Sequence, residues 1–400
     1  MSEDLVVRMY NVRFGDAILV TVPDRNPATG RTVTRRILID VGNAPKVAGT
    51  GRGGEDDVFE AVVGDILDQL DGHPLDLYVM THEHLDHVQG LFYAAERLPA
   101  LKLAERLKIR HLWLTASAAP DYYDNGKHPK AKEQRLAFDA MYRRVAAMMT
   151  SRTAAAAAPG VLDMLANNDP TKTKQCVAYL QTLNLARTHY VHREAKLRGL
   201  HPFREAELSV WAPEEDTSDY YGRMLPLDSG AVPERPQERR ARPAPDPLPP
   251  AGVDAGAFLG LVAARRAGAV DNLFAIDKAA NNTSIVFALE WRGWRLLFSG
   301  DAEIRSWRTM AGQNVLKPVH FLKVSHHGSH NGTPTDEVFE AIMPAVPPDD
   351  RPRRAAISTW DHTYAGIPHE LTNSRLAERA TLLSTLDQRD KLFYDVIFAG

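Results

Sequence analysis

The sequence predicts an α/β protein. Short apolar runs rich in Val, Ile and Leu alternate with longer segments of helical spacing along most of the chain. Of the 400 residues, 44% are hydrophobic, which is enough to fill a large core. Acids and histidines recur directly after the apolar runs, which is where an α/β scaffold gathers its functional residues.

The predicted strands of the first part of the chain end in acids. Residues 5–9 and 17–22 are predicted strands, and the turn between them carries Asp16. Residues 36–40 form a third strand that ends in Asp40. An aspartate at the end of a buried strand either supports a site by hydrogen bonding or caps a turn. Residues 56–70 then show helical spacing.

A dense group of metal-ligand residue types follows the next apolar run, residues 75–80. It consists of His82, Glu83, His84, Asp86 and His87. Imidazole and carboxylate together suit zinc, manganese or iron. In an extended His-x-His the two rings lie on the same side of the backbone, while the last two residues turn the chain toward a second ion. The stretch therefore predicts half of a two-metal site.

The middle of the chain differs in composition. Residues 116–205 are predicted to be a mostly helical insertion, and residues 226–250, with eight prolines, a flexible loop. Between residues 171 and 204 there are seven Lys or Arg and one acid, Glu194. Such a span is either a phosphate-binding face or an ordinary solvated surface. We expect residues 116–205 or 226–250 to be available to a protein partner.

The last third of the chain repeats the pattern of strands that end in polar residues. Residues 285–291 and 294–298 form a hairpin around Arg292 and Gly293, and the hairpin leads to Asp301. Residues 320–324 form a strand directly before His326 and His327. A further strand, residues 355–359, precedes a loop that ends at His369, and residues 392–398 form the closing strand.

Taken together, these motifs resemble a known family. The order of His82, His84, Asp86 and His87, with Asp40 in Leu-Ile-Asp-Val-Gly and Asp301 after Ser-Gly, resembles the metallo-β-lactamase fold. The His-His-Gly-Ser segment at residues 326–329 is similar to the nuclease domain of the ComEC DNA-uptake proteins. The resemblance covers most of residues 5–115 and 206–398. It implies an αββα sandwich in which residues 1–400 form one domain.

The resemblance also implies two divalent metal ions, zinc or manganese. His82 and His84 would hold the first ion, Asp86 and His87 the second, and Asp301 would bridge them. His369 matches the last family histidine. No obvious third histidine follows His87: His111 is the nearest and sits in an apolar strand, where a core or supporting role is the better interpretation. The first ion is therefore expected to be weakly held or absent.

Asp86, His326 and His327 are the candidate catalytic residues. We expect one of the two paired histidines near the metals and the other on the phosphate or acting as an acid, and which of them, or His369, is a ligand stays open. Lys323 is interpreted as packed or structural. The candidates for support or substrate binding are Asp16, Asp40, Asn282, Ser284 and Ser329.

The predicted activity is metal-dependent hydrolysis by a metal-activated hydroxide. By resemblance, the substrate is a phosphodiester and the protein a nuclease that cleaves DNA. The alternatives are a hydrolase of a small ester, lactone or cyclic nucleotide, and a non-catalytic binding subunit with a vestigial site.

Composition indicates the partners and the cellular compartment of the protein rather than the reaction that it catalyses. A net charge of −3 gives no global attraction for nucleic acid. The single cysteine, Cys176, excludes an internal disulfide and a Cys-rich zinc site. No apolar run is long enough to span a membrane, and the first residues lack the basic start of a signal peptide. We expect a cytoplasmic protein without a membrane partner; its oligomeric state stays open.

Overall fold

The computed structural model describes residues 3–45, 55–148, 159–221, 277–332, 336–361, 363–364 and 366–400. The Pro-rich segment 226–250 lies outside the described residues. Within the described part of the chain, no helix combines the length and the apolar character needed to cross a membrane.

The described strands form two sheets. The seven-stranded first sheet has the order β13-β1-β2-β3-β4-β5-β6 and the six-stranded second sheet the order β12-β11-β10-β9-β8-β7. The first sheet is built from β1 (Leu5–Tyr10), β2 (Ala17–Arg25), β3 (Thr32–Val41), β4 (Leu77–Met80), β5 (Leu112–Thr115), β6 (Thr188–Val191) and β13 (Phe393–Phe398). The second is built from β7 (Glu207–Ala212), β8 (Val286–Trp291), β9 (Trp294–Phe298), β10 (Phe321–Lys323), β11 (Arg354–Ile357) and β12 (Thr381–Ser384).

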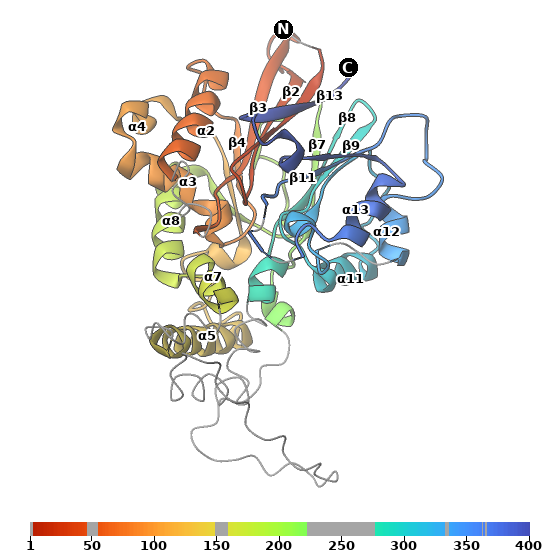
Figure 1. The fold of residues 1–400 in the computed structure, drawn as a ribbon. Helices are drawn as coiled ribbons and strands as arrows, with labels where there is room; N and C mark the ends of the chain where they lie inside the picture. Colours follow the sequence, from red (N-terminus) through yellow and green to blue (C-terminus); the bar gives the residue numbers. More distant parts are fainter. Residues whose placement is uncertain are drawn as a thin grey trace.

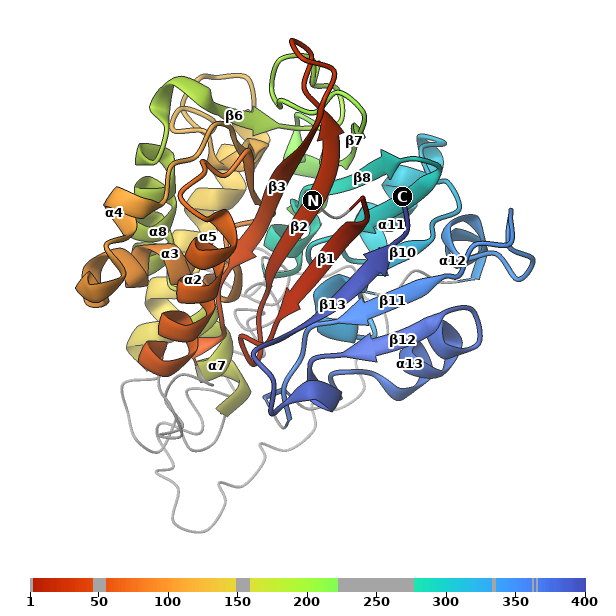
Figure 2. The same ribbon diagram turned by 90° about the horizontal axis from the view of Figure 1, so that it is seen from above.

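Helices cover the outer faces of both sheets (Figures 1 and 2). The first sheet is covered by α2 (Glu55–Leu70), α3 (Leu85–Arg97), α4 (Leu103–Arg106) and α8 (Pro170–Thr182). The second is covered by α11 (Ile304–Gly312), α12 (Asp336–Ile342) and α13 (Glu370–Ala377). Two further helices, α5 (Pro129–Met148) and α7 (Pro159–Asn167), lie at the end of the sandwich opposite both chain termini (Figure 1).

Three apolar clusters hold these four layers together. Side chains alternate along β2: Ile18 and Val20 belong to the cluster between the two sheets, whereas Leu19 belongs to the cluster under α2 and α3. In the second sheet, Leu296 faces the other sheet and Leu297 faces α11 and α12. Successive side chains of both sheets therefore face the other sheet and the covering helices in turn. The result is an αββα sandwich, which confirms the predicted fold class.

The segment from 116 to 205 supplies α5, α7 and α8 and one element that was not expected, a strand. Residues Thr188–Val191 form β6, which pairs in parallel with β5 at the edge of the first sheet. Its alternating sequence, Thr-His-Tyr-Val, is short and half-polar, so the pattern alone does not distinguish it from a loop. The segment is therefore attached to the sandwich by a strand as well as by helices.

Parallel pairing brings the polar strand ends to one edge. β3 and β4 run parallel in the first sheet, and β9, β10 and β11 run parallel in the second. Asp40, His82, Asp301 and His326 all follow or end these strands. Gly42 lets the end of β3 pack closely there, because a Cβ at this position would lie 2.4 Å from the backbone nitrogen of His87.

Candidate metal centre

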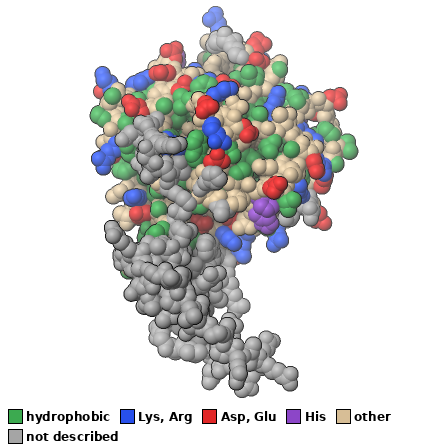
Figure 3. Space-filling model, in the orientation of Figure 1, with side chains coloured by type: hydrophobic (Ala, Val, Ile, Leu, Met, Phe, Trp, Pro, Cys, Tyr) green, Lys and Arg blue, Asp and Glu red, His purple; other side chains and the backbone are tan. Residues whose placement is uncertain are grey.

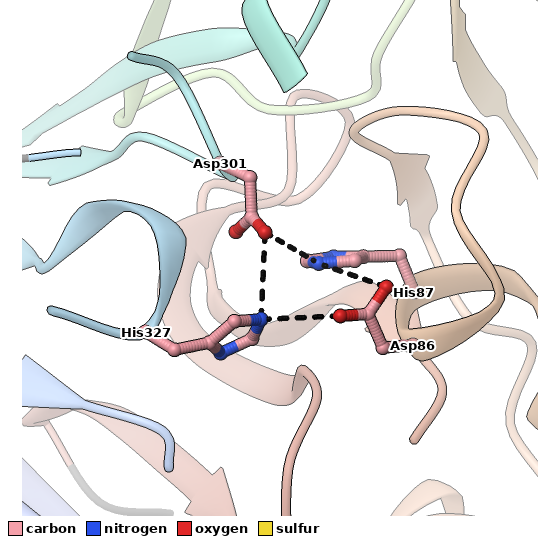
Figure 4. A group of neighbouring side chains, drawn as sticks. All are labelled: Asp86, His87, Asp301 and His327. Atoms are coloured by element: carbon pink, nitrogen blue, oxygen red, sulfur yellow. Dashed lines mark ion pairs between the residues drawn. The ribbon is translucent and has the colours of Figure 1, made fainter. Parts of the chain in front are cut away.

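Four buried side chains converge at this edge: Asp86, His87, Asp301 and His327 (Figure 4). One ligand atom of each lies within 4.8 Å of every other. Asp301 Oδ2 is 3.2 Å from His87 Nε2 and 3.4 Å from His327 Nε2. His327 Nε2 is also 3.4 Å from Asp86 Oδ2. Two imidazole nitrogens and two carboxylates facing a common centre are a donor set that suits zinc, manganese or iron.

The start of α3 positions the first two of these residues. The chain is extended at His84, the N-cap, and becomes helical at Leu85, so Asp86 and His87 lie in the first helical turn. The backbone N–H of Asp86 donates to Asn167 Oδ1 (3.2 Å), and the Asn167 amide donates back to Asp86 Oδ1 (3.1 Å). A free N–H at the helix start is thereby satisfied, and the carboxylate benefits from the positive end of the helix dipole.

Hydrogen bonds fix the orientation of three of the histidines. His87 Nδ1 lies 2.8 Å from Asp40 Oδ2, and His327 Nδ1 lies 2.8 Å from the carbonyl oxygen of Ser358. The Thr81 hydroxyl donates to Asp40 (2.6 Å) and lies 3.1 Å from His82 Nδ1. Because these acceptors take the Nδ1 protons, each ring presents the lone pair of Nε2. This arrangement is typical of histidines that ligate metals.

The ligand-type nitrogens of four histidines make no hydrogen bond in the part of the chain that the structure describes. The Nε2 atoms of His82, His84, His87 and His327 are all buried and lack a hydrogen-bond partner among the described residues. The Nε2 atoms of His87 and His327 face carboxylate oxygens at 3.2–3.4 Å, but without the geometry of a hydrogen bond. Leaving a buried polar atom without a hydrogen bond costs about 1–3 kcal/mol, so the group requires an explanation. A bound cation provides one, since it would satisfy nitrogen lone pairs and carboxylates together. These residues therefore fit a metal ion.

The electrostatics agree with a cation at the cluster. Burial alone would lower the pKa of His87 and of His327, but the nearby carboxylates outweigh it, so the pKa of His87 is raised well above its usual value and that of His327 to about 9. Burial alone would raise the pKa of Asp301, but His327, His87 and Lys323 outweigh it and hold that pKa well below its usual value. Burial, with the neighbouring rings, lowers the pKa of His82, which favours the neutral ligand form. Positive charge therefore stabilises the buried carboxylates, whether it is carried by protons on the histidines or by a metal ion.

Lys323 takes part in this charge balance. Its ammonium is buried, pairs with Asp16 Oδ2, lies 3.5 Å from Asp301 Oδ1 and donates to the carbonyl oxygen of Gly300 (3.1 Å). Asp16 also accepts a hydrogen bond from the Ser358 hydroxyl. A second group of ligand types, Asp16, Asp40 and His87, surrounds the same place. The carboxylates of this second group already bond to Lys323, Thr81 and His87. We therefore interpret the group as support for the four-residue cluster.

The two paired histidines have different environments. His326 and His327 both have left-handed backbone angles, with φ of 48° and 53°. Such angles cost energy in residues other than glycine and are frequent at functional sites. With these backbone angles, the side chain of His327 points into the cluster and is fully buried, whereas the side chain of His326 is 20% exposed. His326 Nδ1 lies 3.3 Å from Glu303 and 3.1 Å from the Ser329 hydroxyl.

His82 and His84 lie beside the cluster as an incomplete second group. Their ring centroids are 4.6 Å apart, and the His82 ring is 4.2 Å from that of His87. The Asp277 carboxylate lies beside His84, with Oδ1 at 3.9 Å from Nε2. The carboxylate of Asp301 has one oxygen toward His87 and the other toward Lys323. A second ion and a bridging role of Asp301 stay predictions.

Two other predicted residues lie apart from the four-residue group. His369 is the N-cap residue of α13, and its ring lies 4.9 Å from that of His330 and its Nδ1 3.4 Å from the Thr372 hydroxyl. The structure thus brings His327, rather than His369, next to Asp86 and Asp301. His111 stacks on His189, with ring centroids 5.8 Å apart.

The predicted supporting residues fix the loops around the cluster. Asn282 Oδ1 accepts from the backbone N–H groups of Glu303 (3.2 Å) and Ser306 (2.9 Å) at the start of α11. The Ser284 hydroxyl accepts from the N–H of Asp301 (3.0 Å). The Ser329 hydroxyl accepts from the N–H of Gly332 (3.0 Å) as well as lying near His326. In this structure these side chains position the ligand residues.

Sequence reasoning missed several residues that reach the site. Asn167 and Asn168, at the end of α7, contact Asp86 and Asp277, while Glu303 contacts His326. A signal for the first two was present: an Asn-Asn pair directly before Asp169-Pro170, which is a helix start. Its meaning depended on where the insertion packs, and the sequence does not contain that information.

Comparison with known proteins adds little to this geometry. No family model matches the chain, and no curated protein matches it. Among solved structures, 26 chains match, including a mutant of CmlA beta-hydroxylase, with 12% sequence identity and a TM-score of 0.40. That match covers 100% of this chain, which spans about half (54%) of the length of the matched chain. At this level of similarity the match carries no functional argument.

Proposed function

We propose that this protein is a metal-dependent phosphodiesterase that hydrolyses nucleic acid, with DNA as the expected substrate. The observation that carries the proposal is the convergence of the buried Nε2 atoms of His87 and His327, which make no hydrogen bond with the described residues, on the carboxylates of Asp86 and Asp301. A bound metal would supply a Lewis acid and an acidified water at this place.

The residues of the chain would divide the remaining work. Asp86, His87, Asp301 and His327 would hold the ion, and Asp40 and the Ser358 carbonyl would keep the two rings aligned. His326 is the partly exposed histidine of the pair and contacts Glu303 and Ser329. It would contact the phosphate or protonate the leaving oxygen. Lys323 would limit the repulsion between Asp16 and Asp301.

The face of the molecule drawn in Figure 3 gives little long-range attraction for DNA. On the face drawn in Figure 3, Lys or Arg and Asp or Glu side chains are interspersed. Recognition of DNA would therefore depend more on contacts near the metal-ligand cluster than on the electrostatic field of the whole protein.

A second candidate is hydrolysis of a small ester, lactone or cyclic nucleotide. One observation favours it: the end of α7 lies directly on the cluster, because Asn167 bonds to both the backbone and the carboxylate of Asp86. A helix in this position restricts the room beside the cluster. This arrangement is compatible with a small substrate or with the end of a single strand.

A cleavage panel tests the proposal. Protein loaded with Mn²⁺ or Zn²⁺ is expected to hydrolyse bis(p-nitrophenyl) phosphate and single-stranded DNA, and Asp86→Asn or Asp301→Asn to reduce the rate by more than about 100-fold, beyond the loss typical of supporting residues. His330→Gln, at an exposed histidine near the site, is the control and should retain the activity. Hydrolysis of a lactone or simple ester with no phosphodiester turnover would favour the second candidate, and wild-type rates in both aspartate variants would refute a metal-dependent reaction at this cluster.

A further inference from the structure

Two histidines of the metal-ligand stretch, His82 and His84, lie outside the four-residue cluster. His82 is 0% exposed and His84 is 3% exposed, and the Nε2 atom of each makes no hydrogen bond with the described residues. The centroids of the two rings are 4.6 Å apart. Buried ligand-type nitrogens that lack hydrogen bonds and lie side by side indicate a cation next to them, because each has lost the hydrogen bond that it makes in water.

The carboxylate of Asp277 faces one of these nitrogens from the other half of the chain. Its Oδ1 atom lies 3.9 Å from His84 Nε2, which is too far for a hydrogen bond. Two ligands of one tetrahedral ion, each about 2.0–2.1 Å from the metal, lie about 3.3 Å from one another. A closure of about 0.6 Å would therefore let Asp277 and His84 bind the same ion.

The group formed by His82, His84 and Asp277 is more open than the four-residue cluster. Its three ligand atoms do not all lie within 4.8 Å of one another, whereas those of the cluster do. The side chain of Asp277 is 24% exposed, so it has room to move toward the two buried rings. An ion bound here is therefore expected to draw Asp277 inward and to be held more weakly than an ion in the cluster.

A buried amide orients the Asp277 carboxylate. The side chain of Asn168, which is 7% exposed, donates from Nδ2 to Asp277 Oδ1 at 2.6 Å. The adjacent Asn167 donates to Asp86 Oδ1 at 3.1 Å. The end of α7 thus holds one carboxylate of the four-residue cluster and the carboxylate that lies beside His84. Carboxylates that ligate metals are commonly hydrogen-bonded in this way.

We propose that Asp277 is the third protein ligand of a second metal ion, which it holds together with His82 and His84. The inference rests on the proposed metal-dependent function and names a residue that completes its site. Two imidazoles and a carboxylate suit zinc, manganese or iron, and three protein ligands leave a position for water or substrate. The helical insertion then belongs to the metal centre, because Asn167 and Asn168 each orient a ligand of a different ion.

The test counts bound ions rather than turnover. Metal-free protein is titrated with Zn²⁺ against a competing chelator, which gives the number of ions bound and the affinity of each. Wild-type protein is expected to bind two ions. Asp277→Asn and His84→Gln should each weaken the second ion by more than about 100-fold, beyond the loss typical of supporting residues, and leave the affinity of the first ion unchanged.

Matched controls separate the loss of a ligand from damage to the fold. Asp219→Asn, at an aspartate whose side chain is 95% exposed, should bind both ions as wild type does. The neighbouring asparagines form a pair of opposite variants: Asn168→Ala should weaken only the second ion, by about 10- to 100-fold, and Asn167→Ala only the first. If Asp277→Asn does not fold, anomalous diffraction from wild-type crystals grown with Zn²⁺ decides: a peak bonded to His84 but not to Asp277 would refute the assignment.

The outcomes distinguish this inference from the proposed function. Unchanged affinities for two ions in Asp277→Asn, or a single ion in wild-type protein, would overturn the assignment and leave hydrolysis at the four-residue cluster intact. Two ions in wild type and one in Asp277→Asn, with no hydrolysis of any phosphodiester, would refute the phosphodiesterase and support the ligand. Wild-type protein that binds no Zn²⁺ would refute both.

Discussion

His87 Nδ1 and Asp40 Oδ2 are 2.8 Å apart, and both side chains are fully buried. Asp40 also accepts hydrogen bonds from the backbone and the hydroxyl of Thr81, at 2.8 Å and 2.6 Å. Its backbone is left-handed, with φ of 51°, a conformation that aspartate tolerates better than most residues. Asp40 therefore fixes the tautomer of one proposed ligand and, through Thr81, the orientation of His82.

The first prediction follows from this bond. Asp40→Asn keeps an oxygen that can accept from His87 but removes the charge that makes the ring a stronger ligand. We expect the metal affinity to fall about 10- to 100-fold, measured by titration of metal-free protein. Asp68→Asn, at an exposed aspartate on α2, is the control. An unchanged affinity in Asp40→Asn would show that the carboxylate does not support a metal ligand.

The second prediction concerns metal removal. A metal that binds only the folded protein stabilises it by about 2.7 kcal/mol at a free concentration of 100 times Kd. We expect chelation to lower the urea-unfolding free energy of wild-type protein by this order, and His327→Gln to lose most of the response. His330→Gln should respond like wild type, because His330 is exposed and belongs to neither metal-ligand group. The same response in His327→Gln and wild type would place the metal elsewhere.

The third prediction concerns Lys323. Its side chain is 1% exposed, and its removal would leave Asp16 buried next to Asp301 without compensation. Lys323→Met is expected to cost about 3–5 kcal/mol of unfolding free energy in metal-free protein, as for other broken buried pairs. Adding Asp16→Asn should recover part of the loss. If the two substitutions are simply additive in urea unfolding, the pair is not coupled.

The fourth prediction is a pH dependence of stability. Burial, with the charges of His189 and Arg187, lowers the pKa of His111 from 6.5 to about 4. As the pH falls, the unfolded chain takes up this proton first, so the contribution of His111 is complete above about pH 6.5 and is lost as the pH falls from 6.5 toward 4. His111→Asn should therefore lose less unfolding free energy than wild type between pH 7.5 and 5. The exposed-site variant His73→Asn should follow wild type, and parallel curves for all three proteins would contradict the shift.

Much of the fold could be predicted from local patterns. The alternation in β2 and the Arg292-Gly293 turn between β8 and β9 are encoded by neighbouring residues, and both occur as expected. The His82–His87 stretch was recognisable because its residue types are rare at this spacing. β6 was missed because a four-residue, half-polar strand at a sheet edge has almost no local signal.

The detailed site could not be predicted for a different reason. The choice between His327 and His369 depends on left-handed backbone angles at residues 326 and 327, and these are imposed by packing. The pairing of Lys323 with Asp16 joins residues from different sheets, and the contact of Asn167 with Asp86 depends on how the insertion docks. Each of these relationships is long-range, so composition and spacing leave it undetermined.

The most direct test of the central claim is anomalous diffraction from crystals grown with Mn²⁺ or Zn²⁺, recorded on both sides of the metal absorption edge. We expect a peak about 2.0–2.2 Å from His87 Nε2, His327 Nε2 and the carboxylates of Asp86 and Asp301, as in known sites of this kind. No peak at this cluster, or a metal held only by other residues, would contradict the account.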